Sequence, residues 1–166
     1  ILYSLMTSLY IISIGLASAI PELGPTGFGI LLASSGIGVA FGAFIISEKG
    51  YLFSSAKLSS TGLSLIAICL CLLGQSQGMF RSNLVLCSLI RLGASLVAIP
   101  AQTTIQRNTP EESFGKVFGL QNNLINISLS LPLLITGALV ASLGLGWVLY
   151  LLAALALFGA LFDKNV

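Results

Sequence analysis

One apolar stretch of the sequence, expected as a helix over residues 83–105, carries polar side chains at helical spacing. At about 100° per residue, one face of that helix would hold Ser88, Arg91, Ser95, Gln102 and Gln106. Arg91 would lie about eight residues inside the stretch, roughly 12 Å deep at about 1.5 Å per residue. Two interpretations stay open: a polar stripe along a water-filled pathway, or an arginine that snorkels outward or makes a structural pair.

A second apolar stretch, over residues 114–140, repeats this pattern with small and amide side chains. Its shared face holds Gly115, Gly119, Asn122, Asn126, Ser130 and Gly137. The amides could line the same pathway, or could form hydrogen bonds between helices worth about 1 kcal/mol each. Pro100 and Pro132 each remove a backbone hydrogen bond and can bend these two helices. Two polar-faced, proline-bent helices that follow one another favour a conduit over a passive anchor.

The residue types that most catalytic and metal sites need are scarce. The chain has no histidine, and its three cysteines, Cys69, Cys71 and Cys87, lack metal or redox spacing. All five carboxylates are expected in loops or at helix ends. We therefore expect no enzyme activity, no metal and no cofactor. The net charge of +2, without a basic run, also argues against nucleic-acid binding.

The elements that position these side chains follow from composition. Only 7% of the 166 residues are charged, against roughly a quarter in a soluble domain, and the charges cluster between long apolar runs. A run of about 20 apolar residues is long enough to cross a bilayer as a helix. The sequence therefore predicts an all-α membrane protein with six transmembrane helices, at about residues 2–20, 27–46, 58–73, 83–105, 114–140 and 146–162.

The basic residues predict how these helices are oriented. With six spans both ends lie on one side, and the loops there hold Lys49, Lys57, Arg107, Lys116 and Lys164. The loops on the opposite side hold Arg81 alone. Because loops rich in lysine and arginine stay in the cytoplasm, we expect both ends of this segment to be cytoplasmic. The expected location is a bacterial-type inner or plasma membrane, crossed several times.

Small residues mark candidate helix contacts. Ser34, Gly38 and Gly42 recur at four-residue spacing in the stretch 27–46, and would let another helix approach closely. Gly115 and Gly119 are expected to do the same on the stretch 114–140. Such faces serve helix packing, although a groove of small residues would also permit sliding between two states.

Three short segments resemble a known family. The segments PAQTTIQR at 100–107, TPE at 109–111 and GKVFG at 115–119 are similar to the connection between the tenth and eleventh helices of the major facilitator superfamily. The most similar branch is that of drug and siderophore exporters, including enterobactin-exporter-like and macrolide-efflux-like proteins. Two departures are visible: Phe114 stands where a basic residue is common, and only Gly42 and the segment 48–50 match the cytoplasmic Gly-Asp-Arg-Gly-Arg signature.

This resemblance covers nearly the whole chain, as helices seven to twelve of a twelve-helix transporter. It implies that residues 1–166 are the C-terminal six-helix half of a secondary active transporter that works by alternating access, an efflux permease. The missing N-terminal half would then belong to the same chain, which agrees with a start at Ile1 inside a hydrophobic run. Arg107, Glu111 and Lys116 would form contacts that hold one state closed on the cytoplasmic side.

The expected partners are a small-molecule substrate, the lipid bilayer and the missing half. A coupling proton is a further expected partner, and its titrating group would lie outside this segment or near the end of a span. The alternative to a carrier is a non-catalytic membrane scaffold, or a channel subunit, built from a six-helix chain.

Overall fold

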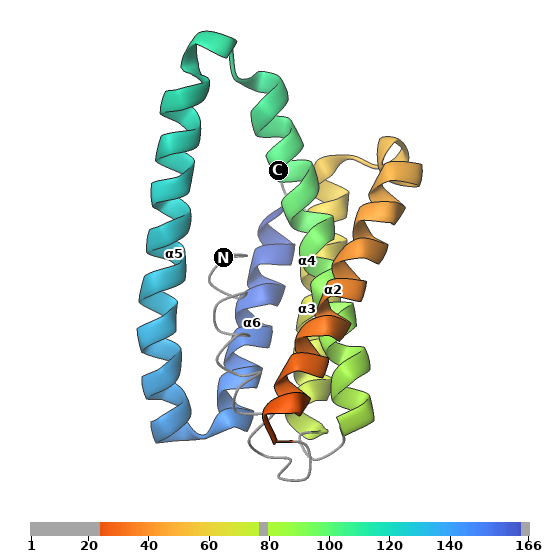
Figure 1. Ribbon diagram of the computed structural model, residues 1–166, viewed down its shortest axis with the longest axis vertical. Coiled ribbons are helices and arrows are strands. Elements are labelled where there is room, and N and C mark those ends of the chain that lie inside the picture. Colours follow the sequence, from red (N-terminus) through yellow and green to blue (C-terminus); the bar gives the residue numbers. More distant parts are fainter. Residues whose placement is uncertain (1–23, 77–79, 164–166) are drawn as a thin grey trace.

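The computed structural model describes residues 24–76 and 80–163, and this part of the chain folds as a helical bundle (Figure 1). Its α-helices are α2 (Gly24–Lys49), α3 (Ser55–Gln75), α4 (Phe80–Asn108), α5 (Phe114–Leu143) and α6 (Leu145–Asp163). Two 3-10 turns, η1 (Gly50–Leu52) and η2 (Glu111–Ser113), lie in the connections. No strand occurs within these residues, so the all-helical class is confirmed for them.

The observed helices correspond to five of the expected spans. Each contains the range predicted for it and runs a little further at one or both ends. Within the described residues, four segments are long and apolar enough to cross a membrane: Ser55–Gln75, Arg81–Asn108, Glu111–Leu143 and Leu145–Phe162. Helix α2 is not among them. The span expected at residues 2–20 lies outside the described residues, so the total of six remains a prediction.

The connections are fixed by local chemistry. The Ser54 side chain caps α3, since its Oγ accepts a hydrogen bond from the Lys57 backbone N–H at 3.3 Å. Pro110 is extended and leads into η2. Gly144 has φ of +83°, a backbone conformation that favours glycine, and this allows the tight turn between α5 and α6.

Successive helices run in opposite directions (Figure 1). The connections after α2 and after α4 therefore lie at one end of the bundle, and those after α3 and after α5 at the other. Lys49, Lys57, Arg107 and Lys116 belong to the first end, and Arg81 belongs to the second. We call the first the basic end. The predicted orientation depends on this grouping of charge and also on Lys164, which lies outside the described residues.

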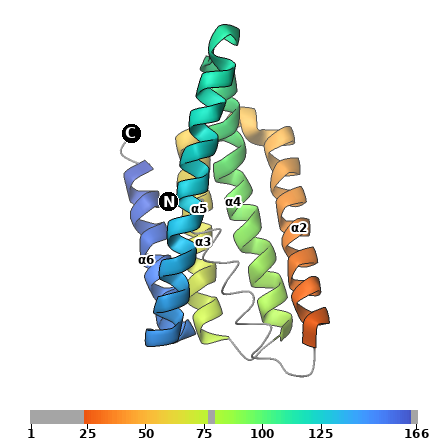
Figure 2. The same cartoon turned by 60° about the vertical axis from the view of Figure 1, so that its left-hand side comes forward.

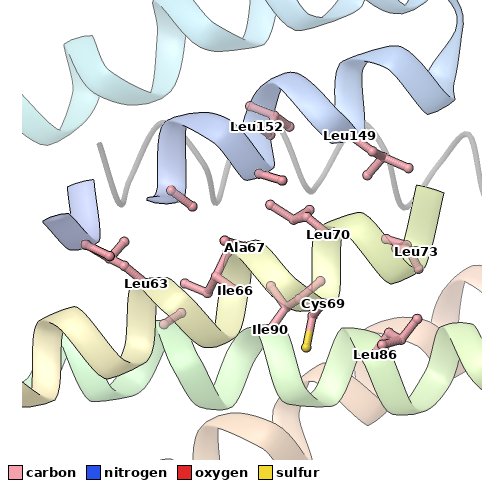
Figure 3. Packing of buried hydrophobic residues seen from close by; sticks show 14 of the residues in the cluster. Leu63, Ile66, Ala67, Cys69, Leu70, Leu73, Leu86, Ile90, Leu149 and Leu152 are labelled. Carbon is pink, nitrogen blue, oxygen red and sulfur yellow. The ribbon is translucent and has the colours of Figure 1, made fainter. Parts of the chain in front are cut away.

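The core lies on both sides of α3, which packs between α4 and α6 (Figure 3). Ile66 and Leu70 of α3, and Leu149 of α6, are completely buried. At the α3–α4 contact Gly62 and Gly93 face one another: a Cβ on Gly62 would lie 2.5 Å from the Gly93 carbonyl oxygen. Van der Waals packing of this kind is what joins helices in lipid, where apolar burial alone gives little preference.

Among the described helices, α5 makes the fewest contacts with the others: it lies at one side of the bundle in Figure 1 and is turned to the front in Figure 2. In the most apolar 18-residue stretch of α5, only 6% is buried, whereas the corresponding stretches of the three other candidate spans are 39–44% buried. Its C-terminal part is the better packed, with Leu139 and Val140 against the core. The bundle therefore consists of a packed group, α2, α4, α3 and α6, with α5 attached through its two connections and a few contacts.

Candidate functional site

The N-terminal part of the predicted polar stripe on α4, at Ser88 and Ser95, packs against helix α2. The Ser88 hydroxyl donates to the backbone oxygen of Ser34 on α2 at 2.7 Å. Gly38 lies directly against the Ser88 backbone, where a Cβ could not be accommodated. These small residues allow α2 and α4 to meet at backbone distance, as the spacing in α2 suggested.

Ser95 belongs to the same contact. It is only 4% exposed, its hydroxyl donates to the Leu92 carbonyl at 2.7 Å, and Gly42 of α2 lies against it. The hydroxyls of Ser88 and Ser95 are thus satisfied by backbone oxygens. The Ser88 hydrogen bond joins α4 to α2, whereas the Ser95 hydrogen bond stays within α4 and Gly42 of α2 packs against its side chain. The pathway role predicted for Ser95 has no open surface in this structure.

Gln102, further along the stripe, contacts α5 instead. The Gln121 Nε2 donates to the Gln102 Oε1 at 2.6 Å, which is the side-chain hydrogen bond that joins α4 to α5. The Gln121 Oε1 is buried and has no partner among the described residues. The amide pair therefore leaves one acceptor unused at the junction of these two helices.

The position of this pair follows from the geometry of a helical hairpin. Gln102 lies six residues before the end of α4, and Gln121 lies seven residues after the start of α5. Residues at similar distances from the turn of an antiparallel pair come to lie opposite each other. The sequence pattern includes Gln102 but not Gln121, and the similar distances of the two residues from the helix ends at this turn are the sequence signal for Gln121.

The backbone of α4 is weakened next to Gln102. Pro100 lacks an N–H, so the Leu96 carbonyl loses its helical donor. The hydroxyls of Thr103 and Thr104 donate to the carbonyls of Ile99 and Pro100, each at 2.9 Å. Hydroxyls that bond back in this way tend to bend a helix. The amide pair thus lies just beyond the part of α4 that deforms most readily.

The predicted polar face of α5 points away from α4. Gln121 and Asn126 are five residues apart, hence about 140° apart around the helix at about 100° per residue. Asn122, Asn126 and Ser130 are all exposed, and the Ser130 hydroxyl donates to the Asn126 carbonyl at 2.8 Å. A Cβ added to Gly115 or Gly119 would meet no atom of the described residues within 4 Å, so this face has no neighbour there.

Arg91 and the predicted gate residues do not belong to the amide pair. Arg91 is half-buried on α4, one turn from Ser88 and Ser95 on the same side of the helix. The predicted gate residues Arg107, Glu111 and Lys116 are exposed at the basic end. In residues 24–76 and 80–163 these three form no ion pair with one another.

Comparison with known proteins relates this chain to a family and to no individual protein. The family model described as Major Facilitator Superfamily matches residues 1–163 of the chain. No curated protein matches the chain, and no solved structure matches it either.

Proposed function

Because this chain belongs to the major facilitator superfamily, a family of membrane transporters, we propose that it works as a secondary active exporter that moves a small solute by alternating access. It is a multi-pass integral membrane protein, and members of its family bind small-molecule substrates within the membrane. A transporter role agrees with the prediction that the chain is not an enzyme. The direction of transport rests on the resemblance of residues 100–119 to the exporter branch.

The observation that carries this proposal is the uncovered polar face of α5. Asn122, Asn126 and Ser130 are exposed on a helix that is otherwise apolar enough to cross a bilayer. Polar side chains in a span rarely face lipid, because amide groups lose their hydrogen bonds there. We assign this face to a water-filled pathway shared with the missing N-terminal six-helix half.

The contact between α4 and α5 supplies an element that can move. It holds the Gln102–Gln121 hydrogen bond next to Pro100, and α5 packs little against the other described helices along most of its length. Movement of α5 away from α4 would expose the unused Gln121 Oε1 to a solute or to water. Gln106 extends the pathway along α4, whereas Arg91 lies on the side of α4 that packs against α2. Arg107, Glu111 and Lys116 would contribute to closure at the basic end.

Cysteine accessibility tests alternating access without knowledge of the substrate. In a full-length variant whose cysteines are replaced by alanine, Asn126→Cys is labelled with a membrane-impermeant maleimide in right-side-out and in inside-out vesicles. We expect labelling from both sides, because a pathway residue at mid-span is open to each side in turn.

Ile127→Cys provides the matched control, since it lies at the same depth and points about 100° away. Ile127 is 56% exposed on an apolar side of α5, and we expect no labelling from either side. Labelling of Asn126→Cys from one side only would contradict alternating access, and equal labelling of both positions would contradict the assigned face.

A further inference from the structure

A cavity of about 950 Å³ opens at the basic end of the bundle, on the side of α3 and α6. It is bounded by the end of α2, the start of α3, the end of α6 and the middle of α4. Most of its wall is apolar: Ile45, Phe53, Leu96, Leu157 and Leu161. None of the residues assigned to the transport pathway lines it, so the cavity is separate from the proposed site.

In the described part of the lining, the charged residues are two lysines: Lys49 at the end of α2 and Lys57 in the first turn of α3. Among the side chains that the structure describes, Glu48 is a neighbouring carboxylate, and it is exposed and lies outside the lining. Two hydroxyls in the wall already have hydrogen-bond acceptors: Ser60 donates to the Ala160 carbonyl at 3.1 Å, and Thr61 donates to the Leu58 carbonyl at 2.9 Å. The cavity therefore combines an apolar wall with an excess of positive charge.

The N-terminus of α3 adds to this charge. Backbone N–H groups in the first turn of a helix have no carbonyl of that helix to bond, and they form its positive end. Here the Lys57 N–H donates to the Ser54 side chain. The N–H groups of Ser55 and Ala56 stand at the start of α3, where no earlier carbonyl of the helix can accept their hydrogen bonds. Ser54 and Ala56 both line the cavity, so these amides lie beside the two lysines.

The depth of the cavity suits a chain of hydrocarbon. Ser64 of α3 lines it, nine residues after the start of that helix, or roughly 14 Å along the axis. The cavity thus extends from the helix ends, where lipid headgroups lie, well into the hydrocarbon layer. A small soluble anion would leave most of the apolar wall in contact with water.

From these features we propose that the basic-end cavity binds one anionic phospholipid. Its phosphate group contacts Lys49, Lys57 and the first amides of α3, and part of an acyl chain lies along Phe53, Leu157 and Leu161. The absence of a carboxylate from the described lining favours a headgroup with net negative charge over a zwitterionic one.

Native mass spectrometry of the full-length chain tests this proposal. The purified protein is mixed with equal amounts of phosphatidylglycerol and phosphatidylcholine, and bound lipid is counted for each. We expect phosphatidylglycerol to be preferred, and the variant Lys49→Gln plus Lys57→Gln to lose its binding by about tenfold, since each basic group contributes to attraction of an anionic lipid. Ser64→Leu, which fills the wall without removing charge, is expected to lower binding as well.

The control variant Arg107→Gln plus Lys116→Gln removes two charges from the same end of the bundle, outside the cavity. It should keep the preference of the unmodified protein for phosphatidylglycerol. An equal loss in this control, or equal binding of the two lipids to the unmodified protein, would overturn the proposal.

Water-soluble glycerol phosphate separates a lipid site from a simple anion site. At millimolar concentration it should leave the bound phosphatidylglycerol in place, because it cannot occupy the apolar wall. Complete displacement would show that the headgroup alone determines binding, and would overturn the assignment to a phospholipid. Neither result depends on whether the chain transports a solute.

Discussion

At the scale of single residues, the Gln102–Gln121 pair is the feature with most bearing on function. A side-chain amide in a span needs a partner, and here each glutamine is the partner of the other. The bond joins α5 to α4, two helices with little other contact between them. The unused Gln121 Oε1 also makes this the point where a solute with a donor group could compete for a hydrogen bond.

We predict that the two amides are energetically coupled. Gln102→Met and Gln121→Met should each lower the free energy of unfolding by about 1 kcal/mol, because each leaves the other amide without its partner. The double variant should lose clearly less than the sum of the two. The measurement is a double-mutant cycle from denaturation in mixed micelles.

Gln106→Met serves as the control for this cycle, since Gln106 is exposed on the same helix. It should combine additively with Gln121→Met. Additive losses for the Gln102 and Gln121 variants would show that the hydrogen bond contributes nothing to the attachment of α5.

At the scale of helices, glycine contacts set how closely the packed group is held together. Gly62 and Gly93 are reciprocal: a Cβ on either would lie 2.5 Å or 2.8 Å from the carbonyl oxygen of the other. On the opposite side of α4, Gly38 and Gly42 lie against Ser88 and Ser95. Helix α4 is therefore held between two close contacts, whereas Gly115 and Gly119 leave α5 without an equivalent one in the described residues.

We predict that Gly62→Ala separates α3 from α4. The added methyl group would also lie 2.9 Å from a Val97 methyl, so the helices must move apart, with a loss of about 1–3 kcal/mol. Gly36→Ala on α2 is the control, because nothing among the described residues lies within 4 Å of that position. It should be neutral or slightly stabilising, since alanine favours a helix. Thermal unfolding in detergent compares the two, and equal midpoints would refute the contact.

At the scale of the whole molecule, the described lysines gather at one end of the bundle. Lys49, Lys57, Arg107 and Lys116 belong to the basic end, while Trp147, which is 70% exposed, begins α6 at the other. Tryptophan is enriched at membrane interfaces, and lysine and arginine at the cytoplasmic face. The basic end therefore indicates the orientation of the bundle, whereas Trp147 marks a membrane interface without distinguishing the two sides.

We predict that the basic end faces the cytoplasm. In the cysteine-free variant, Glu48→Cys and Glu112→Cys should react with an impermeant maleimide only in inside-out vesicles, and Ser142→Cys only in right-side-out vesicles. All three side chains are exposed near helix ends. Reaction of Glu48→Cys and Glu112→Cys from different faces would contradict the alternation of helices, and reaction of both from the outside would reverse the orientation.

Composition and periodicity alone determined the helical class and where the described helices lie. Seven per cent charge and apolar runs of span length leave a chain little choice except helices in lipid, because a bilayer core offers no partner for the backbone. The spacing of Ser34, Gly38 and Gly42 likewise indicated a close helix contact from the sequence, since residues four apart share one face.

Only the tertiary structure decided which neighbour each polar side chain meets. Ser88, Ser95 and Gln102 share one face of α4, yet the first two contact α2 and the third contacts α5. A helical wheel gives the direction of a side chain around its own axis, but not which helix lies in that direction or how far along it extends. That depends on how the helices cross, which is why the basic-end cavity became visible only in three dimensions.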